Sequence, residues 1–417
     1  MRIPERLSLR LNVSWTLAGN LVYGLTQWAA LALLAKLGTP TMVGQFVLAL
    51  AITAPLVLLG SLQLRALQAT DAEEAYAAAD YLTLRVVMMG AVLAGLVVFA
   101  VLHGYETTTL LVLLLVGCAK AVEAISDILY GRMQFHERMD AVARSMIWKG
   151  SVALLGWVVG LLAGGLLWAC VGLLAARVLT LAAVDRPRLL RLEPDLTLRL
   201  RWRPAVLKRL AWLALPLGLV AATGSLVTTM PRYMLERFIG LEALGIFGAL
   251  AYILVAGHMV MSAVAQSASP RIARLLEEGG PDAAGGLLLR LVVLAGALGT
   301  VAVIGAWVAG SPLLRLLYAP EYAEHHHLLV WIMVAGAFSY MATVFGVANT
   351  AIRCLAPQLP LEIGVLLITA ATCVWLIPIH GMYGAAGALV AAGVTRLVGA
   401  WALYTRAARW YEPGAVA

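Results

Sequence analysis

Several charged residues lie inside apolar stretches of this sequence. Lys120, Glu123 and Asp127 are spaced three and then four residues apart, so on a helix they share one face. Two further cations, Lys149 and Arg177, lie in later apolar stretches. Charges are costly in hydrocarbon, so ionisable residues at such positions are functional candidates. We expect the three cations to attract an anionic group, and the two acids to balance them or to accept a coupling proton.

The same residues have a structural interpretation, in which ion pairs lock neighbouring helices together. In the second half of the chain Arg396 is the deep charge, placed about where Arg177 lies in the first half, so it is a candidate for the same role. Arg85 and Glu362 lie near the ends of their apolar stretches. Long side chains at such ends can reach water, which is what we expect of both.

The composition indicates a polytopic membrane protein. Hydrophobic residues make up 62% of the chain, charged residues 12%, and the mean hydropathy is +0.90, whereas soluble domains are roughly 25% charged. The net charge of +8 does not predict nucleic-acid binding, because the basic residues lie in loops. The sequence has no GxxxxGK[ST] motif, no Cys pair with metal-ligand spacing and no catalytic triad pattern. We therefore expect no cofactor, no metal and no enzymatic activity.

A membrane-crossing helix needs about 20 mostly apolar residues, and the chain contains twelve such stretches. They cover about 13–35, 42–64, 82–102, 109–131, 141–163, 165–184, 210–231, 241–264, 286–309, 327–350, 359–378 and 383–405. An even number of spans places both termini on one side. Of the 30 Lys and Arg residues, only Lys36, Arg232, Arg237 and Arg315 fall in segments on the other side. The positive-inside rule then predicts cytoplasmic termini.

The longest polar interruption divides the chain into two lobes. Residues 185–209 form a basic segment containing three prolines, which oppose one continuous helix. We assign it as a cytoplasmic linker between a six-helix lobe at 1–184 and a second one at 210–417. At an offset of 201 residues, Gly44 and Phe46 align with Gly245 and Phe247. This alignment indicates a parallel internal repeat.

Four segments of the second half carry a family resemblance. They read YMLERFIGLEALGIFGALAYI, SPRIARLLEEG, RLLYAPEYAEHHHLLVWIM and HGMYGAAGALVA. With the helix count and the order of the lobes, they make the chain resemble the oligosaccharide (O-antigen type) flippases. These belong to the multidrug/oligosaccharidyl-lipid/polysaccharide exporter superfamily.

The resemblance implies a fold, a substrate and a location. The fold is two six-helix bundles around a central cavity that opens alternately to each side. The substrate is undecaprenyl-diphosphate-linked oligosaccharide, moved from the cytoplasmic to the periplasmic leaflet of a bacterial inner membrane, as in lipopolysaccharide assembly. The implied partners are this lipid-linked substrate, membrane lipids and, as a candidate, a polysaccharide polymerase complex.

Polar residues of the first apolar stretch are candidates for contacts with a sugar. Asn20, Tyr23 and Gln27 have helical spacing and offer the hydrogen-bonding and aromatic groups that sugar recognition needs. Helix packing is the alternative, because polar side chains also bond helices together in lipid.

Two other functions compete with a flippase. A drug or metabolite antiporter of the same superfamily would need a buried acid in its N-terminal helices, but the first stretch contains no Asp or Glu. A membrane glycan polymerase or ligase would need a long outside loop with catalytic charges. The largest outside loop, at about 310–326, is too short for a folded domain.

Overall fold

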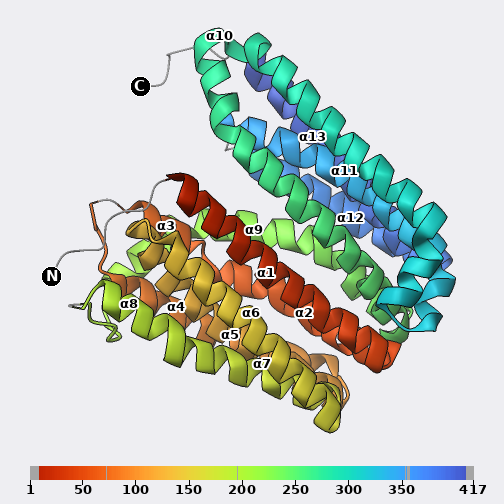
Figure 1. Ribbon diagram of the computed structural model, residues 1–417, viewed down its shortest axis with the longest axis horizontal. Coiled ribbons are helices and arrows are strands. Elements are labelled where there is room, and N and C mark those ends of the chain that lie inside the picture. The colour runs from red at the N-terminus through yellow and green to blue at the C-terminus, as the bar shows by residue number, and fades with distance from the viewer. Residues whose placement is uncertain (1–8, 72, 195, 353, 355–356, 410–417) are drawn as a thin grey trace. The chain divides into compact units, whose positions relative to one another are not determined.

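The computed structural model describes residues 9–409 except 72, 195, 353 and 355–356, and these residues form an all-α protein (Figure 1). Twelve helical stretches of the described residues are long and apolar enough to cross a membrane. This confirms the all-α class and the number of spans. The first half contains α1 (Leu9–Leu37), α2 (Pro40–Ser61), α3 (Leu64–Thr70), α4 (Ala78–His103), α5 (Thr107–Phe135), α6 (Met139–Gly164), α7 (Leu166–Thr180), the π-helix η1 (Leu181–Asp185) and α8 (Arg186–Leu192). The second half contains α9 (Pro204–Phe238), α10 (Leu241–Leu317), the 3-10 helix η2 (Pro320–His325), α11 (His326–Ala351), α12 (Gln358–His380) and α13 (Met382–Arg409).

The chain divides into two compact units, and the division lies between Ser225 and Leu226, inside α9. We call them unit 1 and unit 2. The N-terminal part of α9 belongs to the core of unit 1, where Leu207 and Leu210 pack with Tyr81. The sequence placed the linker at 185–209. In the structure this stretch contains α8 and the end of η1, then a segment without helix, and Pro204 opens α9.

Helix α10 differs from the sequence expectation of two separate spans. It is helical through the polar segment that follows Ser269, because this segment is rich in Ala, Leu, Arg and Glu, which are strong helix formers. The helix is broken only at Gly279 and Gly280, whose backbone angles are not helical. Gly280 has φ 70°, a conformation that glycine adopts without steric cost.

Glycines allow α6 and α7 to approach each other closely. A Cβ added at Gly156 would lie 2.7 Å from the carbonyl oxygen of Gly172, and one added at Gly172 would overlap the carbonyl oxygen of Gly156. Small residues at helix contacts are typical of membrane proteins, since packing rather than hydrophobicity joins helices in lipid. This contact fixes α7 against α6, and therefore the positions of the cations that both helices carry.

Candidate functional site

The carboxylate of Glu123 on α5 joins three helices of unit 1. Lys120 Nζ donates a hydrogen bond to Glu123 Oε2 at 3.0 Å, and Arg177 Nη2 on α7 lies 3.7 Å from the same oxygen. The hydroxyl of Tyr23 on α1 donates to Oε1. Arg177 is only 2% exposed, so its charge lies fully inside the bundle.

Lys149 on α6 completes this group of cations without a carboxylate partner. It is 3% exposed, and its Nζ lies 5.3 Å from the ring centre of Tyr23 and 4.7 Å from that of Tyr130. In the described part of the chain no ion pair within 4.0 Å joins Lys149 to an acid. Aromatic faces attract cations, and more strongly where water is excluded. Lys120, Lys149 and Arg177 thus gather around one carboxylate, and positive charge is in excess there.

A second ion cluster lies one helical turn further along α5. Asp127 Oδ1 accepts a hydrogen bond from Arg65 Nη1 at 3.0 Å, and its Oδ2 lies 3.6 Å from Arg85 Nη2. The expectation that Arg85 reaches water is wrong, because the side chain is 1% exposed and points to Asp127 inside the bundle. Arg85 Nε and Nη1 and Arg177 Nη1 are buried, with no hydrogen-bond partner in the described structure.

Sequence reasoning missed a third buried carboxylate, Asp185. It was assigned to the linker, but the π-helix η1 turns it into the core of unit 1 at 0% exposure. Tyr130 donates to Asp185 Oδ1 at 3.2 Å, and Ser145 donates to the same oxygen. The spacing could have revealed Tyr130, because it lies three and seven residues after Asp127 and Glu123, on the same face of α5.

The remaining sequence candidates lie apart from these clusters. In unit 2, Arg396 on α13 makes a bidentate pair with Glu362 on α12, at 2.9 and 2.6 Å. Glu362 was expected to reach water, but its partner holds it in this pair. Asn20 is exposed and Gln27 half-buried on α1. Neither hydrogen-bonds to the Glu123 cluster within the residues that the structure describes, so only Tyr23 of that trio joins it.

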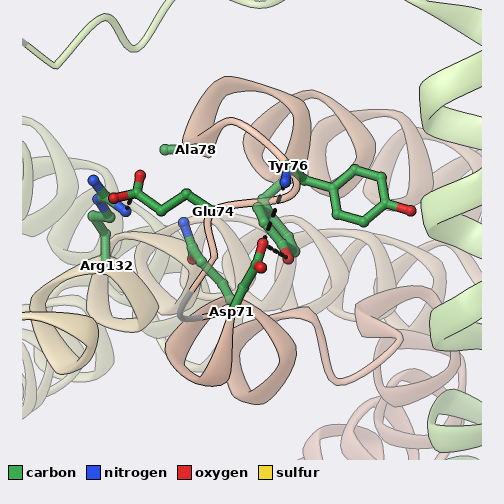
Figure 2. A pocket seen from close by; sticks show the side chains of 7 residues that line it. Asp71, Glu74, Tyr76, Ala78 and Arg132 are labelled. Carbon is green, nitrogen blue, oxygen red and sulfur yellow. Dashed lines mark hydrogen bonds and ion pairs between the residues drawn. The ribbon is translucent and has the colours of Figure 1, made fainter.

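A small recess between α3, α4 and α5 lies away from the three cations (Figure 2). Arg132 of α5 lines it and donates to Glu74 at 3.1 Å, as Figure 2 shows. The same guanidinium donates to both carboxylate oxygens of Glu193, at 2.7 and 2.6 Å. Glu193 directly follows α8, so this pair attaches the basic segment to the end of α5. The hydrogen bonds from Arg132 hold the pKa of Glu193 below its ordinary value, although burial opposes them.

We expect the variant Glu193→Gln to loosen the segment after α8. Its backbone amides at 186–203 should exchange hydrogen about tenfold faster at neutral pH, since charged hydrogen bonds contribute about 1.5 kcal/mol or more. A carboxyl with a lowered folded pKa stabilises above its ordinary pKa, and this contribution is lost as the pH falls through the lowered value. Exchange in the unchanged protein, corrected for intrinsic rates, should therefore accelerate in acid. Equal exchange in both proteins would contradict the attachment.

Comparison with known proteins agrees with this architecture. No family model matches the chain. The capsular polysaccharide biosynthesis protein CapF of Staphylococcus aureus is 28% identical over 337 residues, which cover 80% of this chain and 83% of CapF. An inward-facing multidrug resistance MATE transporter of the MOP superfamily superposes with a TM-score of 0.66 at 13% identity, over 97% of this chain and 95% of the other. A mutant of the Vibrio cholerae MATE transporter VcmN gives a TM-score of 0.64 at 16% identity, over 96% of both chains.

The fold is therefore that of a twelve-helix transporter of the MOP superfamily, which is the multidrug/oligosaccharidyl-lipid/polysaccharide exporter superfamily. Within this superfamily, the relationship to CapF confirms the resemblance to the polysaccharide biosynthesis branch.

Proposed function

We propose that the chain is an inner-membrane flippase, without enzymatic activity, for undecaprenyl-diphosphate-linked oligosaccharide. The lipid would pass from the cytoplasmic to the periplasmic leaflet by alternating access of the two lobes, with both termini in the cytoplasm. The observation that carries the proposal is the excess of buried positive charge in unit 1. There Lys120, Lys149 and Arg177 share the single carboxylate of Glu123.

A diphosphate complements such a cluster better than a neutral or cationic solute does. Uncompensated charge in hydrocarbon is costly, so a site with spare cations gains most from an anionic ligand. Arginine binds phosphate oxygens through a planar fork of donors, and Arg177 has one buried nitrogen without an acceptor. Asn20, Tyr23 and Gln27 would offer hydrogen bonds to the glycan. Glu123 would release cations to the diphosphate and take them back afterwards.

The acids Glu123 and Asp127 remain our candidates for ion coupling. Each accepts ion pairs from two cations, so substrate that draws away a cation would leave the carboxylate free for a proton. Arg396, paired with Glu362 in unit 2, would contribute to binding in the same way. A polysaccharide polymerase complex is the partner that would consume the flipped lipid.

A drug or metabolite antiporter is the second candidate, and the superposition on MATE transporters favours it. The two functions predict opposite charge preferences. A cationic drug would be repelled by the three cations, whereas a lipid-linked diphosphate would be attracted.

The deciding experiment measures which leaflet holds the lipid-linked glycan. Deleting the gene should cause this lipid to accumulate on the cytoplasmic leaflet. Complementation with the variant Lys149→Met, which keeps the length of the side chain, should lower the flipping rate about tenfold or more, because a charged contact to phosphate is lost. Lys36→Met, a change of an exposed lysine on α1, is the matched control and should flip normally. Increased drug sensitivity of the deletion strain without lipid accumulation would contradict the proposal.

A further inference from the structure

The segment that follows α8 alternates between buried and exposed side chains. Leu196 and Leu198 pack against the hydrophobic cluster that contains Leu129, Met133 and Leu189. The residues between and after them, Thr197 and Arg199, are exposed. Such alternation is typical of an extended chain, whose successive side chains point to opposite sides.

The alternation continues beyond the part of the segment that the protein covers. Leu200 and Trp202 belong to the apolar series that begins at Leu196, yet they are 58% and 71% exposed. Arg199, Arg201 and Arg203 form the other series, and all three are exposed. The end of the segment therefore presents two uncovered apolar side chains on one side and three arginines on the other.

Fixed contacts hold this segment at one end of unit 1. Glu193 is paired with Arg132, and the backbone N–H of Arg201 donates to Thr83 Oγ1 of α4 at 2.9 Å. The neighbouring acids are engaged elsewhere, Glu193 by Arg132 and Asp185 by two hydroxyls. In the described part of the chain no ion pair within 4.0 Å neutralises the three arginines.

We propose that residues 196–203 are a docking surface for anionic phospholipid headgroups. Leu200 and Trp202 enter the interface of the bilayer, where tryptophan is enriched, and the three arginines bind the lipid phosphates. Basic residues beside a transmembrane helix are attracted to anionic lipid. A merely solvated basic loop would not require a leucine and a tryptophan to be exposed on the side that begins with buried leucines. This surface is independent of the transported substrate and would anchor the end of unit 1 at the membrane surface.

The test is binding of phosphatidylglycerol to the full chain. The unchanged protein and the variant Arg199→Gln/Arg201→Gln/Arg203→Gln are purified, and phosphatidylglycerol is titrated in a phosphatidylcholine background with native mass spectrometry as the readout. Binding of the variant should be about a hundredfold weaker, because each arginine near an anionic surface contributes about fivefold. The control, Arg271→Gln/Arg274→Gln/Arg406→Gln, removes three exposed arginines of unit 2 and should bind like the unchanged protein.

Further arms separate the proposal from its rivals. Single Arg201→Gln and Arg203→Gln variants should each bind about fivefold less tightly, and they replace the triple variant if it does not fold. The variant Trp202→Ser should also bind more weakly, because its apolar contact with lipid is lost. Equal binding by the triple variant and the unchanged protein, or an equal loss in the control, would overturn the proposal. Displacement of the lipid by inorganic diphosphate at a comparable concentration would identify a free-phosphate site and would also overturn it.

Discussion

Replacing Glu123 by alanine should lower the free energy of unfolding of the protein by about 3–5 kcal/mol, because removing one member of a buried ion pair leaves its partners charged and uncompensated. Glu123 is the carboxylate that Lys120 and Arg177 contact, and Lys149 lies beside it across the ring of Tyr23. Without it, three cations would remain together in the interior of unit 1. Chemical unfolding in detergent or in lipid nanodiscs measures the loss.

Two companion variants distinguish charge from packing. Tyr23→Phe removes only the hydroxyl that donates to Glu123, and we expect a loss of about 1 kcal/mol. The double variant Glu123→Ala/Lys149→Met removes an acid and a cation together. It should be more stable than Glu123→Ala alone, since residues of one charge network are not additive. If Glu123→Ala were as stable as Tyr23→Phe, the carboxylate would not be the counterion of this cluster.

Replacing Gly172 by leucine should prevent unit 1 from packing correctly. A single added Cβ already overlaps the carbonyl oxygen of Gly156, and a backbone atom cannot move aside without separating α6 from α7. Overpacking typically costs about 1–3 kcal/mol and more where the backbone must shift. We therefore expect about 3 kcal/mol or more, measured as a fall in the midpoint of thermal unfolding and in the yield of folded protein.

The control for this substitution is Gly90→Leu on α4. No atom outside its own helix lies within 4 Å of a Cβ added at Gly90, and leucine is a better helix former than glycine. This variant should be as stable as the unchanged protein or slightly more stable. Equal stability of the two leucine variants would contradict close α6–α7 packing. Because Lys149 and Arg177 lie on these two helices, Gly172→Leu should also impair transport.

The helices could be predicted from local sequence, whereas the partners of the charges could not. Runs of about 20 apolar residues identify membrane-crossing helices, since a helix alone satisfies its backbone in lipid. The three- and four-residue spacing placed Lys120, Glu123 and Asp127 on one face of α5. The same periodicity gives no distance to other helices, so the pairing of Asp127 with Arg65 and Arg85 was not foreseen.

Composition and periodicity by themselves determined the all-α membrane class, the twelve spans and the candidate charges, because hydrophobicity and helical repeat act over short stretches of chain. Only the tertiary structure decided that Arg85 is buried on Asp127, that Asp185 turns inward through a π-helix, and that Arg177 and Lys120 share Glu123. These outcomes depend on which helices pack together and how closely. The contact of Gly156 with Gly172 sets that closeness between α6 and α7, through side chains that lie far apart in sequence and meet only in the folded bundle.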